Sequence, residues 1–245
     1  MTVIPQGRTR RAALVSAMCA LVVTGMGLTG CSEDPDAGTN GVGKLPPDKI
    51  QSRTRSAARA ADAVHLSGTV ATSGRTYSLD MRLKSAGATG SVTTKGLSFQ
   101  LLRIGEQLFL KADASFWSQN GGDADAAADK LGGKYVKVPQ GDPSYKKFIG
   151  FTHKDVLLDG LLTLHGALAK DGHHEQAGVR IIRITGDKGS GGTLDVSLDG
   201  KPYPLRLVRA GSAGTLRFSD WGKDFALEKP AKDETLDYGK QLPTS

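Results

Sequence analysis

The sequence predicts an α+β protein built on a strongly curved antiparallel sheet, with helices inside the curve. Two blocks of short segments alternate apolar and polar residues, with the period of two that is typical of half-buried strands. A segment with apolar residues at helical spacing separates the two blocks. Glycine-rich turns favour hairpins between neighbouring segments, and an antiparallel sheet of about ten strands has to curve.

The first thirty residues have the order of an export signal. Arginines at 8, 10 and 11 precede an uncharged apolar stretch over 12–29, and Leu28-Thr29-Gly30 leads into Cys31. This ending resembles a bacterial lipoprotein signal, which implies cleavage before Cys31 and a diacylglyceryl group on its thiol. The alternative is an uncleaved anchor, because the apolar stretch is nearly long enough to span a bilayer. Either way, we expect the folded part on the extracytoplasmic face of the cell membrane.

Charge and cysteine content exclude several classes of function. Without the three signal arginines, 29 basic and 25 acidic residues leave a formal charge of +4, with no dense basic stripe for nucleic acid. The chain has two cysteines: Cys19 leaves with the signal and Cys31 is expected to carry the lipid. The mature domain therefore has no cysteine for a disulfide or a thiolate metal site.

Three parts are predicted: a lipoprotein signal over 1–30, a flexible tether over 31–47 and one domain over 48–245. The tether is rich in small polar residues, Gly and Pro. A helix is expected over 48–63. The first block of strands follows at 64–70, 77–83, 88–95, 97–101 and 107–112, and a sixth strand is expected at 134–138.

Two helices are predicted beyond the first block. A short one is expected over 123–131, ended by Gly132-Gly133. The clearer one is expected over 153–169, where Leu157, Leu161, Leu164 and Leu168 form one stripe. Asp142-Pro143 is interpreted as the start of a loop.

The second block begins after a polar loop expected over 170–178. Strands are predicted at 179–185, 193–198, 203–209, 215–219 and 225–227, followed by a polar tail. Asp199-Gly200 is a strong hairpin signal between the second and third of these.

No catalytic or metal motif stands out. His173, His174 and Glu175 are better explained by a solvated loop than by a metal site, because the two imidazoles do not share a helix face. Nucleophile elbows, phosphate loops and dinucleotide fingerprints are absent from the sequence. We therefore expect no enzyme, no metal and no cofactor. Phe116, Trp117 and Trp221 could be core residues or could line a ligand cavity.

Turn and strand motifs over 64–221 resemble the LppX/LprG family of actinobacterial lipoproteins, which are similar in shape to LolA-type carriers. The matching segments are Val64-His65-Leu66-Ser67-Gly68-Thr69, Leu108-Phe109-Leu110-Lys111 with Phe116-Trp117, Leu198-Asp199-Gly200-Lys201-Pro202-Tyr203-Pro204 and Phe218-Ser219-Asp220-Trp221-Gly222. The resemblance implies a half-barrel with helices over its concave side, an apolar cavity, and non-catalytic binding of acyl chains. The insert over 119–129 and the His173 loop have no counterpart in it.

The leading hypothesis is a membrane-anchored lipoprotein that binds a lipid or glycolipid for transport or presentation at the cell envelope. An envelope sensor that binds a protein partner is the alternative, and an envelope hydrolase would need a converging Ser/His/Asp or metal cluster. The candidate cavity residues are apolar positions of the strands and of the expected central helix: Leu79, Met81, Phe99, Leu101, Val156, Leu157, Leu161, Leu164, Leu168, Ile182, Ile184, Val196 and Leu207.

Overall fold

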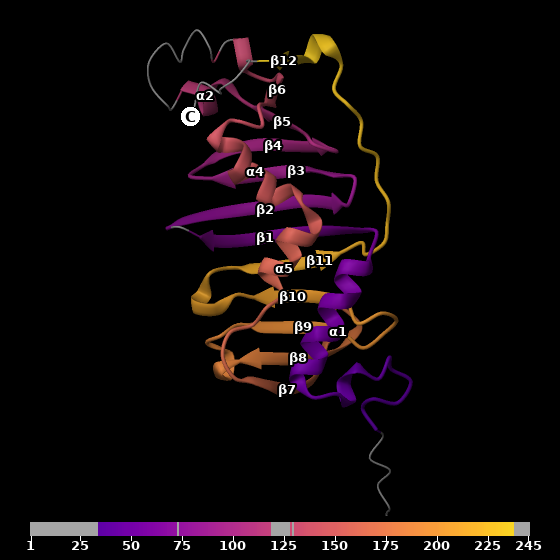
Figure 1. The fold of residues 1–245 in the computed structure, drawn as a ribbon. Helices are drawn as coiled ribbons and strands as arrows, with labels where there is room; N and C mark the ends of the chain where they lie inside the picture. The colour runs from indigo at the N-terminus through magenta and orange to yellow at the C-terminus, as the bar shows by residue number, and fades with distance from the viewer. Residues whose placement is uncertain (1–33, 73, 119–127, 129, 238–245) are drawn as a thin grey trace, which may run out of the picture. The chain divides into compact units, whose positions relative to one another are not determined.

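The computed structural model describes residues 34–72, 74–118, 128 and 130–237, in which the strands form one curved, unclosed sheet (Figure 1). The predicted export signal, including Cys31, and most of the helix predicted over 123–131 lie outside these residues. The strands are β1 (Ala63–Thr72), β2 (Arg75–Lys84), β3 (Gly87–Thr94), β4 (Leu97–Ile104), β5 (Gln107–Ala112), β6 (Tyr135–Val138), β7 (Leu168–Gln176), β8 (Val179–Gly186), β9 (Thr193–Ser197), β10 (Pro204–Val208), β11 (Thr215–Ser219) and β12 (Thr235–Asp237).

The sheet grows outward from β1 in both directions. Strands β1 to β6 follow each other toward one edge, and β7 to β11 return from the opposite edge until β11 pairs with β1. Neighbours are antiparallel except β6 and β12, which are parallel. The α+β half-barrel predicted from the sequence is therefore confirmed, with this one parallel pair as an addition.

Helices cover one face of the sheet. They are α1 (Pro47–Ala60), α2 (Ala114–Ser118), α4 (Pro143–Thr152) and α5 (Lys154–Leu161), with short 3-10 turns at Val42–Lys44, Asp187–Gly189, Ala210–Ser212 and Lys232–Glu234. Figure 1 shows α1, α4 and α5 lying across the strands on the same side. Helix α4 contacts β3 and β4, whereas α1 contacts β7 and β8, so α4 and α1 cover opposite halves of the sheet. None of the helices among the described residues is both long and apolar enough to cross a membrane.

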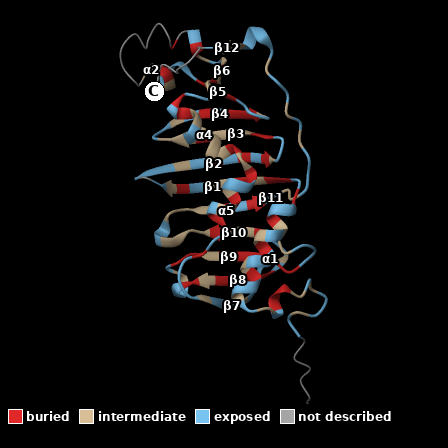
Figure 2. Cartoon of the chain, viewed as in Figure 1, coloured by how far each residue is buried: buried red, intermediate tan, exposed pale blue. Residues whose placement is uncertain are grey.

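A continuous apolar core lies between the sheet and the helices (Figure 2). Strand β2 illustrates how the sequence builds it: Leu79, Met81 and Leu83 are buried, and the polar residues between them are exposed. Helix α1 contributes only a narrow stripe, in which Ile50 and Ala58 are buried. Period-two alternation therefore correctly identified the face of β2 that enters the core.

The helix predicted over 153–169 is wrong: the observed helix is shorter, and the predicted leucine stripe does not lie on one helix. Helix α5 ends at Leu161, and Leu168 already belongs to β7. Gly166 adopts a left-handed φ of 77°, and a side chain there would collide with the carboxylate of Asp187. That carboxylate accepts a hydrogen bond from the backbone N–H of Ala167 at 2.8 Å, which fixes the turn into β7. The leucines with helical spacing therefore belong to three elements: a helix, a turn and a strand.

Asp142-Pro143 begins a helix rather than a loop. The carboxylate of Asp142 accepts a hydrogen bond from the backbone N–H of Ser144 at 2.7 Å, and Pro143 occupies the first turn of α4. An Asp cap followed by Pro is an ordinary helix start, because Pro has no N–H to leave unsatisfied there. Interpreting Asp142-Pro143 as the start of a loop therefore missed a ten-residue helix.

Three further predictions at the sheet margins are wrong. The polar loop expected over 170–178 is largely the edge strand β7, which pairs with β8 over its whole length but buries no apolar face. The strand expected over 225–227 has no regular structure. The polar tail instead contains β12, which pairs with β6. Backbone pairing rather than apolar burial defines β7, so its sequence lacks the alternating pattern.

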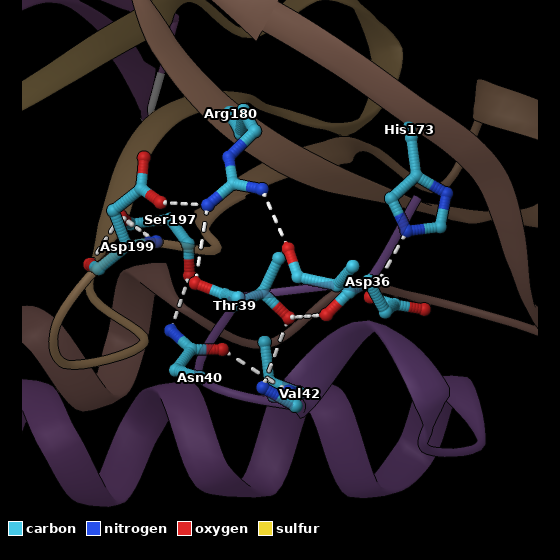
Figure 3. A network of polar contacts seen from close by, with 11 residues as sticks. Asp36, Thr39, Asn40, Val42, His173, Arg180, Ser197 and Asp199 are labelled. Atoms are coloured by element: carbon cyan, nitrogen blue, oxygen red, sulfur yellow. Dashed lines mark hydrogen bonds and ion pairs between the residues drawn. The ribbon is translucent and has the colours of Figure 1, made fainter. Parts of the chain in front are cut away.

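Most of the segment expected to be a flexible tether is packed against the edge formed by β7, β8 and β9. We call residues 36–44 the N-terminal clamp. The amide of Asn40 donates to the carbonyl of Ser197 at 2.9 Å, Arg180 donates to the carbonyls of residues 37 and 38, and His173 contacts Asp36 at 3.1 Å (Figure 3). Val42 is buried in the core. Small polar residues that suggest a linker here make specific side-chain and turn hydrogen bonds instead.

Two buried cations join the helices to the rest of the molecule. Arg103 of β4 donates to the carbonyl of Thr152, the last residue of α4, at 3.0 and 3.2 Å. Lys154, at the start of α5, donates to the carbonyls of Arg59 and Ala61 at 2.8 and 2.7 Å. A cation is favourable beside the carbonyls that a helix C-terminus leaves unpaired. These contacts hold α4 against β4 and α5 against the end of α1.

Candidate functional site

A cavity opens between α4 and the ends of strands β2, β3 and β4. Its volume is about 350 Å³, within the range of small-molecule sites. The lining residues come from the strand ends, from α2 and from one face of α4: Arg75, Tyr77, Thr94, Lys95, Leu97, Phe116, Ser144, Lys147, Phe148 and Phe151. We call this space the α4 cavity.

Strand register places the sheet side of the α4 cavity. Tyr77 of β2 lies opposite Thr94 of β3, and Thr94 lies opposite Leu97 of β4. Arg75 precedes Tyr77 by two residues and therefore shares its face of the sheet. Lys95 follows Thr94 in the tight turn to β4, where Lys95 and Gly96 both have positive φ. The hairpin that ends β3 thus presents Lys95 beside the cavity.

Aromatic rings form the apolar wall. The ring of Tyr77 lies 5.6 Å from that of Phe151, and Phe99 lies 5.3 Å from Phe148 and 5.2 Å from Phe116. Phe148 and Phe151 are three residues apart on α4 and point to the same side of the helix. The rings lie at tilted angles, an arrangement that adds to the stability gained by burying them.

The mouth of the α4 cavity is basic. Arg75, Lys95 and Lys147 are exposed and line the same space as the aromatic rings. None of the three forms an ion pair or a side-chain hydrogen bond with any residue that the structure describes. The described lining residues include no Asp or Glu. An apolar wall under a positive rim suits an amphiphilic molecule better than a purely polar one.

The predicted cavity residues fall into three groups. Val156 is 64% exposed on α5, whereas Leu157 and Leu168 are partly buried and pack against the core. Leu161, Leu164 and Leu207 meet around a second, smaller space of about 170 Å³ beneath the end of α5. The others are buried in the continuous core: Leu79, Met81, Phe99, Leu101, Ile182, Ile184 and Val196. Phe99 contacts two rings that line the α4 cavity, those of Phe116 and Phe148.

The sequence allowed Phe116, Trp117 and Trp221 to be either core or cavity residues, and the structure shows both roles among them. Phe116 lines the α4 cavity, whereas Trp117 is only 1% exposed and belongs to the core. Trp221 stacks on Tyr203 with ring centres 4.7 Å apart, and its indole N–H donates to the carbonyl of Pro204 at 3.1 Å.

Within the described part of the chain, no three His, Cys, Asp or Glu side chains come together as metal ligands. A Ser-His-Asp arrangement does occur: Ser219 lies 3.2 Å from Nδ1 of His65, whose Nε2 lies 2.7 Å from Asp80. The three residues sit on neighbouring strands β11, β1 and β2, on the face opposite the core, and they line none of the cavities described here. His65 and Ser219 are cross-strand partners in the ladder. A polar cross-strand ladder explains this arrangement, since Asp80, His65 and Ser219 lie on strands that pair directly with one another.

Sequence reasoning missed most of the α4 cavity because it missed α4. The residues that it did not select are Arg75, Tyr77, Thr94, Lys95, Leu97, Ser144, Lys147, Phe148 and Phe151. The Asp142-Pro143 start signal, followed by aromatics at spacing three, would have placed Phe148 and Phe151 on one helix face. No local signal predicts that Arg75 and Lys95 would meet Lys147, because the helix that carries Lys147 reaches them only through the tertiary fold.

Comparison with known proteins identifies the fold. No protein-family model and no curated protein matches the chain. The crystal structure of LprF from Mycobacterium bovis is similar with a TM-score of 0.54 and 15% identity, covering 76% of this chain and 97% of that one. LppX from Mycobacterium tuberculosis is similar with a TM-score of 0.47 and 16% identity, covering 75% of this chain and 100% of that one. The chain therefore has the fold of LprF, in agreement with the likeness to LppX/LprG lipoproteins indicated by its sequence motifs.

Proposed function

We propose that this chain is a lipid-anchored lipoprotein of the cell envelope that binds an acyl chain of a lipid or glycolipid without catalysis. The observation that supports this best is the aromatic-walled α4 cavity in a fold shared with LprF. Burying apolar surface contributes about 25 cal/mol per Å², so an acyl chain gains affinity from the rings alone. Transport or presentation of that lipid is the corresponding role at the extracytoplasmic face.

The anchor in this proposal is a diacylglyceryl group on Cys31, at the end of the signal-like segment. Two acyl chains are sufficient for stable attachment, at about 0.8 kcal/mol for each buried CH₂. The clamp begins at Asp36, so only the short stretch over 31–35 separates the proposed anchor from residues packed on the sheet. A span of five residues reaches about 17 Å at most, which keeps the domain close to the membrane surface.

Native mass spectrometry tests this function directly. The protein for the measurement is the mature chain with Cys31→Ser, which retains every described residue and removes only the lipid attachment. After incubation with a total lipid extract of the expression host, we expect a one-to-one complex whose extracted ligand contains an acyl chain. A mass without ligand under these conditions contradicts the proposal and favours the sensor alternative.

Filling the α4 cavity should prevent this binding. Leu97→Trp places an indole in the space beside Thr94 and Phe148, and we expect ligand occupancy to fall at least tenfold while the thermal unfolding transition remains cooperative. Leu205→Trp on β10 is the matched control, because Leu205 is also a partly buried strand leucine and lies outside the cavity. Equal occupancy in the two variants would place the ligand elsewhere.

A further inference from the structure

The positive rim of the α4 cavity is assembled from three separate parts of the chain. Arg75 begins β2, Lys95 lies in the turn between β3 and β4, and Lys147 lies on α4. All three line one space, and all three are exposed. The convergence of cations that are distant in sequence gives this rim a single sign of charge.

The rim is also unneutralised among the residues that the structure describes. Several other basic side chains do have acidic partners: Arg59 lies 3.0 Å from Asp159, Arg180 lies 2.7 Å from Asp199 and Lys84 lies 2.6 Å from Asp224. Within the residues that the structure describes, Arg75, Lys95 and Lys147 have no such partner. Asp142, which caps α4, is buried and accepts a hydrogen bond from the backbone N–H of Ser144 at the start of the helix.

An opening lined by several cations concentrates the electric field and attracts anions. Arg and Lys donors bind phosphate and carboxylate oxygens through short charge-assisted hydrogen bonds. Below the rim, Phe116, Phe148 and Phe151 offer only apolar surface. A molecule that satisfies both layers has an anionic head and a hydrocarbon tail.

We propose that the α4 cavity selects anionic lipids, with the acyl chain against the aromatic wall and the phosphate or carboxylate head at Arg75, Lys95 and Lys147. This inference rests on the lipid-binding function proposed above and names the ligand class of that site. Neutral lipids with the same tails gain the apolar contacts alone and therefore bind more weakly.

The test compares two lipids with identical acyl chains, dioleoyl phosphatidylglycerol and dioleoyl phosphatidylcholine. Competition between them for the mature Cys31→Ser chain is measured by native mass spectrometry of the one-to-one complexes. We expect phosphatidylglycerol to be preferred at least tenfold at low salt and less at high salt, since the rim is exposed and therefore screened. Each neutralised cation should reduce the preference about fivefold, so that the variant with Arg75→Gln, Lys95→Gln and Lys147→Gln loses it.

The matched control neutralises one arginine and two lysines at other sites, with Arg53→Gln, Lys201→Gln and Lys229→Gln. These three residues are exposed and lie outside the α4 cavity, so the control has the same net charge as the rim variant and should keep the preference. Loss of the preference in both variants would attribute it to net charge and overturn the inference.

The remaining outcomes separate this inference from the proposed function. Equal binding of the two lipids overturns anionic selection and leaves lipid binding intact, whereas binding of neither overturns both. Saturable binding of inorganic phosphate that does not compete with phosphatidylglycerol would show a free-phosphate site and overturn the headgroup assignment. Sedimentation with phosphatidylglycerol vesicles through the rim residues, without any one-to-one lipid complex, would identify a membrane-contact surface and overturn it as well.

Discussion

Arg103 illustrates how one buried residue can position a binding element. Its side chain is 2% exposed and joins the end of α4 to β4 and to the turn at Gly105, where it donates to the carbonyl at 2.8 Å. Burial lowers the pKa of Arg103, with Glu106 and Tyr145 opposing that shift. The guanidinium remains charged because its ordinary pKa is far above neutrality. The residue therefore fixes α4, and with it one wall of the cavity, through a charge that contacts backbone carbonyls.

Replacing Arg103 should loosen α4 and destabilise the domain. Arg103→Met removes the donors to Thr152 and Gly105 and leaves those carbonyls without their partner. We expect the free energy of unfolding in urea to fall by about 3 kcal/mol. Arg82→Met on β2 is the control, because Arg82 is exposed and should change stability by about 0.5 kcal/mol or less. Equal effects of the two substitutions would contradict the structural role of Arg103.

His153, between α4 and α5, should make stability depend on pH. Burial lowers its pKa, the positive charge of Arg103 lowers it further, and Glu106 and Asp155 oppose these effects. The folded state therefore binds this proton less readily than the unfolded state, so stability rises with pH in this range. As the pH falls below about 6.5, His153 should reduce the free energy of unfolding. His153→Gln should flatten the profile measured by urea unfolding between pH 8 and 5, and an unchanged slope would exclude His153 as its source.

At the scale of elements, the central strands followed from alternation and α1 from its composition, whereas α4 and the end of α5 did not follow from the sequence. Strand β2 has a clear in-and-out pattern, so a local signal was sufficient there. The leucines from Leu157 to Leu168 have helical spacing, but Gly166 and the contact of Ala167 with Asp187 divide them between α5 and β7. That contact joins residues twenty positions apart and depends on the tertiary fold. The α4 cavity was missed for the same reason, since its rim depends on register and on where α4 crosses the sheet.

The N-terminal clamp is an element that composition alone identifies wrongly. Its residues are small and polar, yet Asn40, Arg180 and Asp199 connect it to β8 and to the turn after β9 (Figure 3). The Asn40 side chain also accepts from the backbone N–H of Val42 at 3.1 Å, which forms the turn that buries Val42. A linker and a clamp can therefore have similar compositions, and the difference lies in the partners that the sheet edge provides.

Releasing the clamp should expose it without unfolding the sheet. Arg180→Ala removes the donors to the carbonyls of residues 37 and 38, and we expect faster amide hydrogen exchange over 36–44, with a loss of about 1–2 kcal/mol in stability. Arg217→Ala on β11 provides the control at an exposed strand arginine outside the clamp. Unchanged exchange over 36–44 in the Arg180 variant would show that the other contacts of the clamp, such as those of Asn40, Val42 and His173, are sufficient to hold it.

At the scale of the molecule, an unclosed sheet has two edges, and this chain protects them differently. The β7 edge is polar and charged along its length, and the clamp lies against it. The opposite edge would be β6, whose Val136 and Val138 are buried, but the parallel strand β12 covers it. An uncovered strand with apolar residues is a template for pairing with another chain. The last described segment of the chain therefore closes the edge that side-chain charge does not protect.

Removing β12 should make the protein self-associate. A chain ending at Ala231 lacks Thr235, Leu236 and Asp237, the partners of β6, and exposes the backbone of Tyr135–Val138. We expect dimers or larger species in sedimentation velocity at micromolar concentration, whereas a chain ending at Asp237 retains β12 and should remain monomeric to the same extent as the full domain. Because β6 lies at the end of the sheet nearest α2, its loss of cover should leave the distant clamp unaffected in hydrogen exchange. Equal sedimentation of the two shortened chains would show that the backbone of β6 needs no partner, and that the polar side chains of Tyr135 and Lys137 are sufficient to keep this edge from pairing.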